Sequence, residues 1–270
     1  MTAVKTILLT NDDGIDSPAL LPTYRALTRI AERVVVVVPH VERSWIGKAI
    51  TRRDDVVVTT EVRDGVEIIT TTGFPADCTQ IGLFNITDPK PELVVSGINI
   101  GANHSTAFLF GSGTVGAAIE GALVGVPSLA FSASSDPDNF GPWNTFMRSA
   151  ESVPTWETIA DVSAGLVNQV VAGGFPDDVD VLSVNLPEGV RADSPVRVAP
   201  LGYTGYGQLF KEQSPGVMRH DWGNDVGPMN GADLSGSDIE LCHDGSVVVT
   251  PLQLPRLSES LASTKALFSP

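Results

Sequence analysis

The sequence predicts an α/β protein: a three-layer α/β/α sandwich on a mostly parallel sheet, with a β-rich C-terminal appendage. Apolar strand patterns alternate with helical patterns through the first two thirds of the chain. The clearest strand, residues 34–38, consists of valines alone, which is typical of a parallel sheet covered on both faces. After about residue 195, short strands and frequent Gly, Pro and Asp replace the alternation. We therefore expect a Rossmann-like core over residues 1–195 and an appendage over residues 196–270, which could serve as an arm exchanged between subunits.

The expected elements follow one another in order along the chain. Ser17 and Pro18 predict a helix start, because a hydroxyl can cap a helix and proline suits its first position. Residues 55–60 and 66–71 predict two strands joined by an Asp-Gly hairpin turn. The other expected strands are residues 5–10, 93–96, 127–133, 178–187 and 245–252. The other expected helices are residues 75–85, 113–125 and 155–172.

The composition is that of a folded protein without a membrane anchor. Of the 270 residues, 42% are hydrophobic, which is ample for a packed core. The chain has no apolar run long enough to span a bilayer, and its start lacks the basic and apolar regions of a signal peptide. Cys78 and Cys242 are the only cysteines, and we expect both to be buried thiols. These features predict a cytoplasmic protein.

The charge balance is strongly acidic. The chain has 17 basic and 32 acidic residues, a formal net charge of -15. Such a surface repels nucleic acids and anionic lipid, so we expect neither a nucleic acid nor a membrane as partner. Only five of the basic residues are lysines. An acid-rich, lysine-poor surface keeps a protein soluble in concentrated salt, so a salt-loaded cytoplasm is one hypothesis and an ordinary acidic protein the other.

The first of three unusual loops is "NDDG", directly after the expected first strand. Ligands of an open α/β sheet bind outside the carboxyl ends of its strands, which is where Asp12 and Asp13 fall. Asn11 and Gly14 suit a turn, and only a turn lets two adjacent side chains share one target. A hard divalent cation such as Mg²⁺ or Mn²⁺ would offset the repulsion between the carboxylates. The alternative for this pair alone is an Asx-type turn with two solvated carboxylates.

The second loop, "PHVERSWIGKAIT", follows the valine strand. Ser44 could offer a hydroxyl to a ligand, and Arg43 or Lys48 could attract a phosphate. Loops commonly contain such residues, so this signal is weak when taken alone.

The third loop, "SGINIGANHSTAFLFGSGTVGAA", follows the strand at residues 93–96 and is the most informative. Asn99 offers a neutral oxygen, and "GSGT" opens a helix. Free backbone N–H groups at a helix start, together with the hydroxyls of Ser112 and Thr114, form an anion site. The alternative is a glycine-rich turn that only closes the packing of helix on sheet. The lysine of a Walker motif is missing.

Together the three loops predict metal-assisted phosphate chemistry. Two other phosphate-handling classes fit less well. A phospho-receiver domain needs an acceptor aspartate after its third parallel strand, where this chain has "SGIN", and the chain is twice too long. A phosphatase of the haloacid-dehalogenase type needs D-x-D, whereas Asp12 and Asp13 are adjacent.

Several segments resemble the SurE family of metal-dependent nucleotidases, the stationary-phase survival proteins. They are "ILLTNDDGIDSP", "PHVERS", "TTGFPADC", "LVVSGINIGAN" and "SGTVGAAIEGALVGVPSLAFS", and "SDIELCHDGSVVVTPL" resembles the family's C-terminal strand. The resemblance is dense over residues 5–133. It implies hydrolysis of nucleoside 5′- and 3′-monophosphates with one divalent cation per subunit, Mg²⁺ or Mn²⁺. It also implies a homo-oligomer, dimer or tetramer, with exchanged C-terminal segments.

The resemblance also implies the roles of individual residues. The metal ligands would be Asp12, Asp13, Ser44 and Asn99. The phosphate would be bound by Asn103, Ser112, Gly113 and Thr114. Asp12 is the candidate to orient the attacking water, and Asn103 the candidate to stabilise the transferred phosphoryl group. His40 and His104 could donate to the leaving group or be structural. A sensor or scaffold that binds metal and nucleotide without turnover is the alternative function.

The chain departs from the family pattern at three positions near these motifs. His40 stands where the family often has aspartate, and Trp45 where glycine follows the serine. Ser105 stands where the family usually has glycine. Because Trp45 is bulky, we expect the base or sugar pocket to differ. His243, beside Asp244, is expected to be a turn residue.

Overall fold

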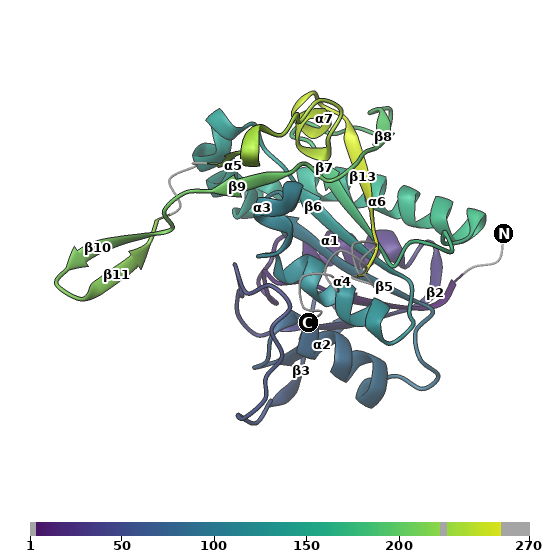
Figure 1. Cartoon of the computed structure of the whole chain (residues 1–270). Coiled ribbons are helices and arrows are strands. Elements are labelled where there is room, and N and C mark those ends of the chain that lie inside the picture. Colours follow the sequence, from purple (N-terminus) through teal and green to yellow (C-terminus); the bar gives the residue numbers. More distant parts are fainter. Residues whose placement is uncertain (1–3, 222–225, 255–270) are drawn as a thin grey trace, which may run out of the picture.

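The fold is built on one nine-stranded sheet with helices on both faces (Figure 1). The computed structural model describes residues 4–221 and 226–254. The sheet contains β1 (Val4–Thr10), β2 (Ala31–Pro39), β3 (Val58–Arg63), β4 (Val66–Thr71), β5 (Leu93–Ile100), β6 (Ser128–Ala133), β7 (Val181–Leu186), β8 (Val196–Val198) and β13 (Val247–Leu252). Their order is β3-β4-β2-β1-β5-β6-β7-β13-β8.

Most of the sheet is parallel, as the sequence predicts. The run from β4 through β2, β1, β5 and β6 to β7 is parallel throughout. Antiparallel pairing occurs where β3 joins β4 and where β13 joins β7. The carboxyl ends of β1, β2 and β5 therefore meet at one edge, which brings the three unusual loops together.

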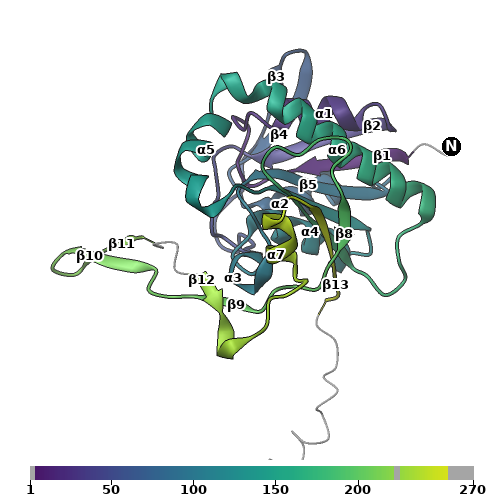
Figure 2. The same ribbon diagram turned by 90° about the horizontal axis from the view of Figure 1, so that it is seen from above.

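Helices cover the two faces of the sheet in separate layers (Figures 1 and 2). The helices are α1 (Leu20–Leu27), α2 (Pro75–Ile81), α3 (Ser105–Leu109), α4 (Gly113–Leu123), α5 (Phe140–Met147), α6 (Val153–Gly173) and α7 (Asp238–His243). A π-helical turn, Gly82–Ile86, extends α2, and 3₁₀ turns lie at Pro137–Asn139, Ala150–Ser152 and Met229–Gly231. Among the described residues, none of the helices combines the length and apolar character needed to cross a bilayer.

Strand β1 contributes to two separate cores, because successive residues of a strand point to opposite faces. Ile7 packs in a cluster with Leu20 of α1 and Trp156 of α6. Its neighbour Leu8 packs on the other face with Cys78 of α2. All these side chains are buried, which explains why the strand is apolar at consecutive positions.

The first helix begins later than the sequence predicts. Helix α1 starts at Leu20, its N-cap is Ala19, and no side chain caps it. The backbone N–H of Ser17 donates to the carbonyl of Gly14 (3.3 Å), and its own carbonyl accepts from Leu20 (3.1 Å). Ser17 therefore belongs to a turn that leads away from the strand end. The predicted hydroxyl cap with proline at the first helical position is wrong.

The predicted hairpin is confirmed. Asp64 and Gly65 join β3 to β4 with φ of 50° and 77°. Positive φ at both central residues is the conformation that two-residue hairpin turns favour. Strand β3 starts at Val58 rather than at residue 55, since the N–H of Val57 donates to the side chain of Thr72 (3.0 Å).

The C-terminal part is β-rich, but two of its strands, β8 and β13, complete the main sheet. Strands β9 (Thr204–Tyr206) and β12 (Val226–Pro228) form a separate pair. Strands β10 (Phe210–Ser214) and β11 (Val217–His220) form a hairpin, the arm, which extends away from the body (Figures 1 and 2).

Both cysteines are buried free thiols, as expected. Cys78 lies under the sheet with Leu8, and Cys242 packs against Ala199 and Val248. Burial raises the pKa of each thiol to about 12, so neither is poised as a nucleophile.

Candidate active site

The turn after β1 is closed by the side chain of Asn11. Its amide nitrogen donates to the carbonyl of Gly14 (2.9 Å), and its oxygen accepts from the N–H of Gly14 (3.1 Å). Gly14 has φ of +83°, and a Cβ there would lie 2.9 Å from the backbone carbon of Val41. Only glycine fits this position. The sequence expectation for Asn11 and Gly14 is therefore confirmed, and the turn fixes Asp12 and Asp13 between them.

Both aspartates are buried, with 5% exposure for Asp12 and 8% for Asp13. Oδ1 of Asp12 accepts from the hydroxyl of Thr114 (2.5 Å), and Oδ2 of Asp13 accepts from the N–H of Ile100 (3.0 Å). Burial raises the pKa of both carboxyl groups, and the charge of Asp12 raises that of Asp13 further. This burial excludes the alternative of two solvated carboxylates. The pair needs a proton or a cation to be stable.

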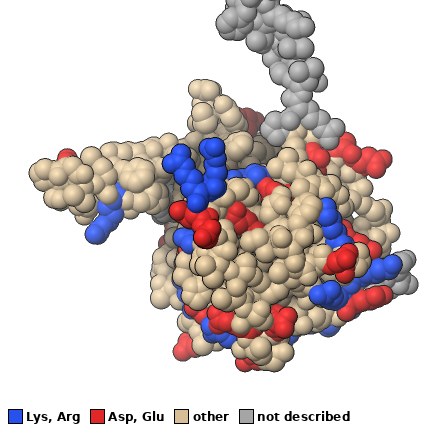
Figure 3. Space-filling view, turned by 90° about the horizontal axis from the view of Figure 1, so that it is seen from below, with Lys and Arg blue, Asp and Glu red and all other residues tan. Residues whose placement is uncertain are grey.

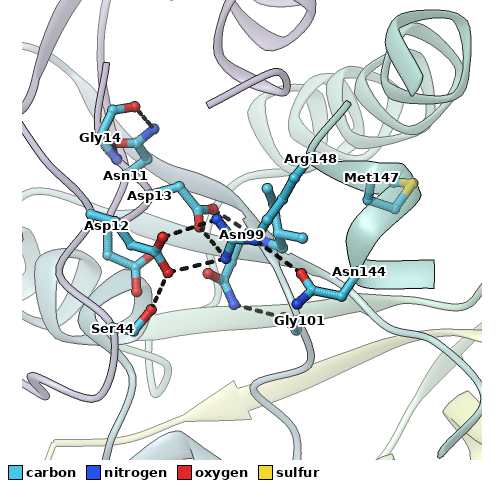
Figure 4. A network of polar contacts seen from close by, with 12 residues as sticks. Asn11, Asp12, Asp13, Gly14, Ser44, Asn99, Gly101, Asn144, Met147 and Arg148 are labelled. Carbon is cyan, nitrogen blue, oxygen red and sulfur yellow. Dashed lines mark hydrogen bonds and ion pairs between the residues drawn. The ribbon is translucent and has the colours of Figure 1, made fainter. Parts of the chain in front are cut away.

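Ser44 and Asn99 complete a group of oxygen donors around the pair (Figure 4). The amide nitrogen of Asn99 donates to the carbonyl of Gly101 (2.7 Å), which leaves its oxygen available to a ligand. Ser44 comes from the loop after β2, and its hydroxyl donates to Glu42 (2.6 Å). Asp12, Ser44 and Asn99 line the same cavity.

The chemistry of this donor set suits a hard divalent cation, because every donor is an oxygen. Within the described ranges, no group of three or more His, Cys, Asp and Glu side chains could bind a metal. A cation at the two aspartates would therefore depend on the neutral oxygens of Ser44 and Asn99.

Arg148 and Glu42 belong to the site although the sequence did not reveal them. Arg148 follows α5, and its two terminal nitrogens pair with Glu42 at 2.9 and 3.0 Å. One of these nitrogens lies 3.8 Å from Oδ1 of Asp13. Arg148 also lines the cavity, so it brings a positive charge to the carboxylates (Figure 4). It lies in a segment without a motif, and only the fold brings it to β1.

The two cations proposed from the second loop lie elsewhere. The guanidinium of Arg43 donates to the carbonyl of Thr72 (2.9 Å), and Lys48 pairs with Glu120. Neither lines the cavity. The expectation that Arg43 or Lys48 attracts the phosphate has no support here, whereas Arg148 does line the cavity.

The start of α4 lies directly against Asp12. Ser112 is the N-cap, and its hydroxyl oxygen accepts from the N–H of Val115 (3.0 Å). A Cβ on Gly113 would lie 2.8 Å from Cβ of Asp12, so glycine permits the close approach. The hydroxyl of Thr114 is wholly buried and donates to Asp12. Ser112 therefore lines the cavity, whereas Gly113 and Thr114 lie behind the carboxylate.

Asn103 lines the cavity and is fixed by two hydrogen bonds. Its backbone N–H donates to the side-chain oxygen of Asn185 (2.9 Å), and its amide nitrogen donates to the hydroxyl of Ser132 (2.7 Å). One amide hydrogen remains for a ligand. Asn103 is buried and lines the cavity beside Asn99.

The cavity has a volume of about 380 Å³ and a mixed lining. Its polar lining includes Asp12, Asn99 and Asn103. Aromatic, histidine and apolar side chains also line it, namely Trp45, His104, Phe108, Phe140, Val226, Ile239 and His243. A cavity of this size, with polar and apolar side chains in its lining, fits a small organic molecule that carries a charged group.

The structure places three histidines relative to the cavity. His40 is exposed, lies 3.8 Å from Glu61 and lines no part of the cavity. His104 does line it. His243 is not a simple turn residue, because it ends α7 and packs its ring against His104.

Trp45 and Ser105 adopt left-handed backbone conformations, both with φ of 57°. These are two of the positions where the family that the sequence resembles usually has glycine. A side chain in this conformation costs about 1 kcal/mol or more. Trp45 contacts the ring of Phe108 at a centroid distance of 6.3 Å and that of His220 in the arm at 5.3 Å. The strained backbone thus places an indole between cavity and arm.

Comparisons with known proteins agree with one another. The family model "Survival protein SurE" matches residues 7–208. The 5′-nucleotidase SurE of Methanoculleus marisnigri is 36% identical over 265 residues, which cover 97% of both chains. That of Hyperthermus butylicus is 33% identical over 259 residues, which cover 94% of this chain and 86% of the relative. The crystal structure of the SurE protein from Aquifex aeolicus has a TM-score of 0.75 and 30% identity, over 98% of this chain and 100% of that one.

Proposed function

The chain belongs to the SurE family, and we propose that it is a metal-dependent phosphohydrolase acting on nucleoside 5′- and 3′-monophosphates. The observation that carries the proposal is the buried pair Asp12 and Asp13, of which Asp12 lines a cavity of about 380 Å³. Two buried carboxylates with raised pKa values suit a cation, and the cavity beyond them suits the remainder of a small phosphate ester. The relatives carry the name 5′-nucleotidase, which agrees with this chemistry.

The cation would be bound by Asp12, Asp13, Ser44 and Asn99. When bound, a divalent cation such as Mg²⁺ or Mn²⁺ supplies Lewis acidity to the phosphoryl group and lowers the pKa of water. Asp12 also orients the attacking water, because its carboxylate lies at the cavity wall and is fixed by Thr114.

The phosphate would be bound by groups in the cavity lining that donate hydrogen bonds. Asn103 offers its free amide hydrogen, and Ser112 offers a hydroxyl hydrogen, since its oxygen already accepts from the helix. The N–H groups at the start of α4 add partial positive charge. Arg148 can leave Glu42 for a phosphoryl oxygen, because both groups are partly exposed. Such donors stabilise the charge of the transferred phosphoryl group.

The functional unit would be a homo-oligomer, a dimer or tetramer joined through the arm. The arm exposes Phe210, Val217 and Met218, which a monomer would leave in water. Substituting Val217 and Met218 by aspartate should lower the mass in analytical ultracentrifugation. An unchanged mass would exclude the arm as the contact.

The experiment that tests the function is phosphate release from the 5′- and 3′-ribonucleoside monophosphates, with Mg²⁺, with Mn²⁺ and with EDTA. The proposal expects release with a cation and none with EDTA. Binding of cation and nucleotide without release would instead support a sensor or scaffold. Release that continues in EDTA would contradict the assigned role of the aspartates.

A further inference from the structure

His104 is a buried side chain with unused hydrogen-bonding groups. It is only 3% exposed, and among the described residues neither ring nitrogen has a partner in another residue. The rings of Phe108 and His243 pack against it at centroid distances of 5.7 and 5.3 Å, nearly at right angles. Native structures rarely leave a buried polar group without a partner, so such a group calls for a ligand.

The His104 ring is neutral in the fold. Burial, and next the neighbouring His243, lower the pKa of His104 to about 3. A neutral imidazole offers one N–H donor and one nitrogen acceptor. Both groups can be used by an uncharged polar edge that donates and accepts, whereas a phosphate dianion, which only accepts, would use the N–H alone.

The place of His104 in the cavity determines which part of a substrate it would meet. It directly follows Asn103 in the chain and lines the same cavity, where the rings of Phe108 and His243 pack against it. A nucleotide whose phosphate lies at Asp12 and Asn103 would place its sugar and base along the remaining lining of the cavity, which includes these rings. The ring of Trp45, which contacts Phe108, also lines the cavity and offers a flat apolar surface to a base.

We propose that His104 is a specificity-determining residue that hydrogen-bonds the nucleoside of the substrate through a neutral edge with one acceptor and one donor. The proposal rests on the proposed function, because it takes the phosphate end as given. Base ring nitrogens, exocyclic amino groups and ribose hydroxyls share this chemistry, and the experiment separates base from sugar.

The test compares the wild-type protein with His104→Leu and His104→Gln, and with His40→Leu as control. His40 is exposed and lies outside the cavity. Binding of adenosine, guanosine, cytidine and uridine is measured by calorimetry. The kcat and KM are measured for the four nucleoside monophosphates, for ribose 5-phosphate and for p-nitrophenyl phosphate.

We expect His104→Leu to weaken the tightest nucleoside by about tenfold, the effect of one or two lost hydrogen bonds, and to raise KM for its nucleotide equally. The kcat and the turnover of p-nitrophenyl phosphate should stay within about twofold, and His104→Gln should recover part of the affinity. The ligand-free melting temperature of His104→Leu should rise, because the variant loses an unpaired buried polar group. A purely structural histidine would give the opposite shift.

Each outcome decides a separate question. A higher KM for the nucleotide alone supports a contact to the base, and a higher KM for ribose 5-phosphate as well supports a contact to the sugar. Nucleoside binding unchanged in His104→Leu, or absent from the wild type, would overturn the proposal. A loss of kcat on all substrates would also overturn it, since His104 would then act at the phosphate. If no substrate is hydrolysed while nucleoside binding still depends on His104, the proposed function fails and this inference stands.

Discussion

At the scale of single residues, the site depends on two carboxylates that the fold buries side by side. Burial and the charge of Asp12 raise the pKa of Asp13. The N–H of Ile100, which donates to Asp13, and the more distant Arg148 lower this pKa, but to a smaller extent. This is an unfavourable arrangement for two anions, and it is tolerated because Asn11 and Gly14 fix the turn. Functional sites often contain such locally unfavourable groups.

The first prediction concerns the variant Asp13→Asn. An amide of the same shape removes one negative charge, so the variant should bind Mn²⁺ far more weakly and release phosphate at least roughly a hundredfold more slowly. The metal-free fold should be as stable as the wild type or more so, because the repulsion with Asp12 is gone. Calorimetry with Mn²⁺, a phosphate assay and thermal unfolding check the three statements. Full activity in Asp13→Asn would remove this residue from the ligand set.

The second prediction concerns pH and His104. In the unfolded chain a histidine takes up a proton near pH 6.5, but His104 in the fold does so only near pH 3. Between these values the unfolded state binds more protons, so the contribution of His104 to stability decreases as the pH falls. The melting temperature of His104→Leu should therefore exceed that of the wild type by a margin that grows from neutral toward acidic pH. A constant margin would show that the ring does not stay neutral in the fold.

At the scale of elements, the start of α4 is shaped to meet the end of β1. Gly113 allows the helix to approach Asp12, and the N-cap Ser112 lines the cavity. The same segment of sequence therefore serves packing and ligand binding. This explains why the sequence alone left two alternatives open for the glycine-rich helix start, an anion site or a turn that only closes the packing of helix on sheet.

The third prediction compares two glycines in helices. Alanine at Gly113 would lie 2.8 Å from Cβ of Asp12 and 3.0 Å from Cγ2 of Ile46, and overpacking of this kind costs about 1–3 kcal/mol. Gly113→Ala should lower the melting temperature and weaken Mn²⁺ binding as Asp12 is displaced. Gly165 lies exposed in α6, where an added methyl group would meet no neighbouring side chain within 4 Å, so Gly165→Ala should stabilise the protein by about 0.5–1 kcal/mol. Equal effects of the two substitutions would contradict the close approach.

The three loops that contribute to the site could be predicted from the sequence, but the cavity-lining residues from more distant segments could not. Asp12 follows β1, Ser44 lies in the loop after β2 and Asn99 lies at the carboxyl end of β5, and the carboxyl ends of these parallel strands meet at one edge of the sheet. Arg148 follows α5 in a segment without a motif, and His243 ends α7 far from the first loops in the sequence, so only tertiary packing brings them to the cavity. The start of α1 was misplaced because a serine before a proline suits a turn as well as a helix cap.

At the scale of the whole molecule, the fold combines a parallel sheet with a C-terminal part that returns to it. Strands β8 and β13 extend the sheet beyond β7, while the arm leaves the body between them (Figure 2). His243 of α7, in this returning part, lines the same cavity as Asp12 in the first loop. The cavity therefore needs both parts of the chain.

The fourth prediction follows from the net charge of -15. On the face shown in Figure 3, acidic and basic side chains lie next to one another, and no continuous basic patch is visible. Salt screens repulsion between surface charges, so thermal stability should rise between about 0.1 M and 0.5 M KCl. A protein adapted to a salt-loaded cytoplasm should continue to gain stability and activity into the multimolar range. A plateau below about 1 M, where screening is already complete, would identify an ordinary acidic protein.

The proposed function depends above all on a divalent cation bound by the two buried aspartates. Anomalous diffraction from crystals grown with Mn²⁺ tests this directly, because it locates the metal without reference to activity. We expect a peak bounded by carboxylate oxygens of Asp12 and Asp13, the hydroxyl of Ser44 and the side-chain oxygen of Asn99. No peak at this position, in a preparation that releases phosphate with Mn²⁺, would contradict it.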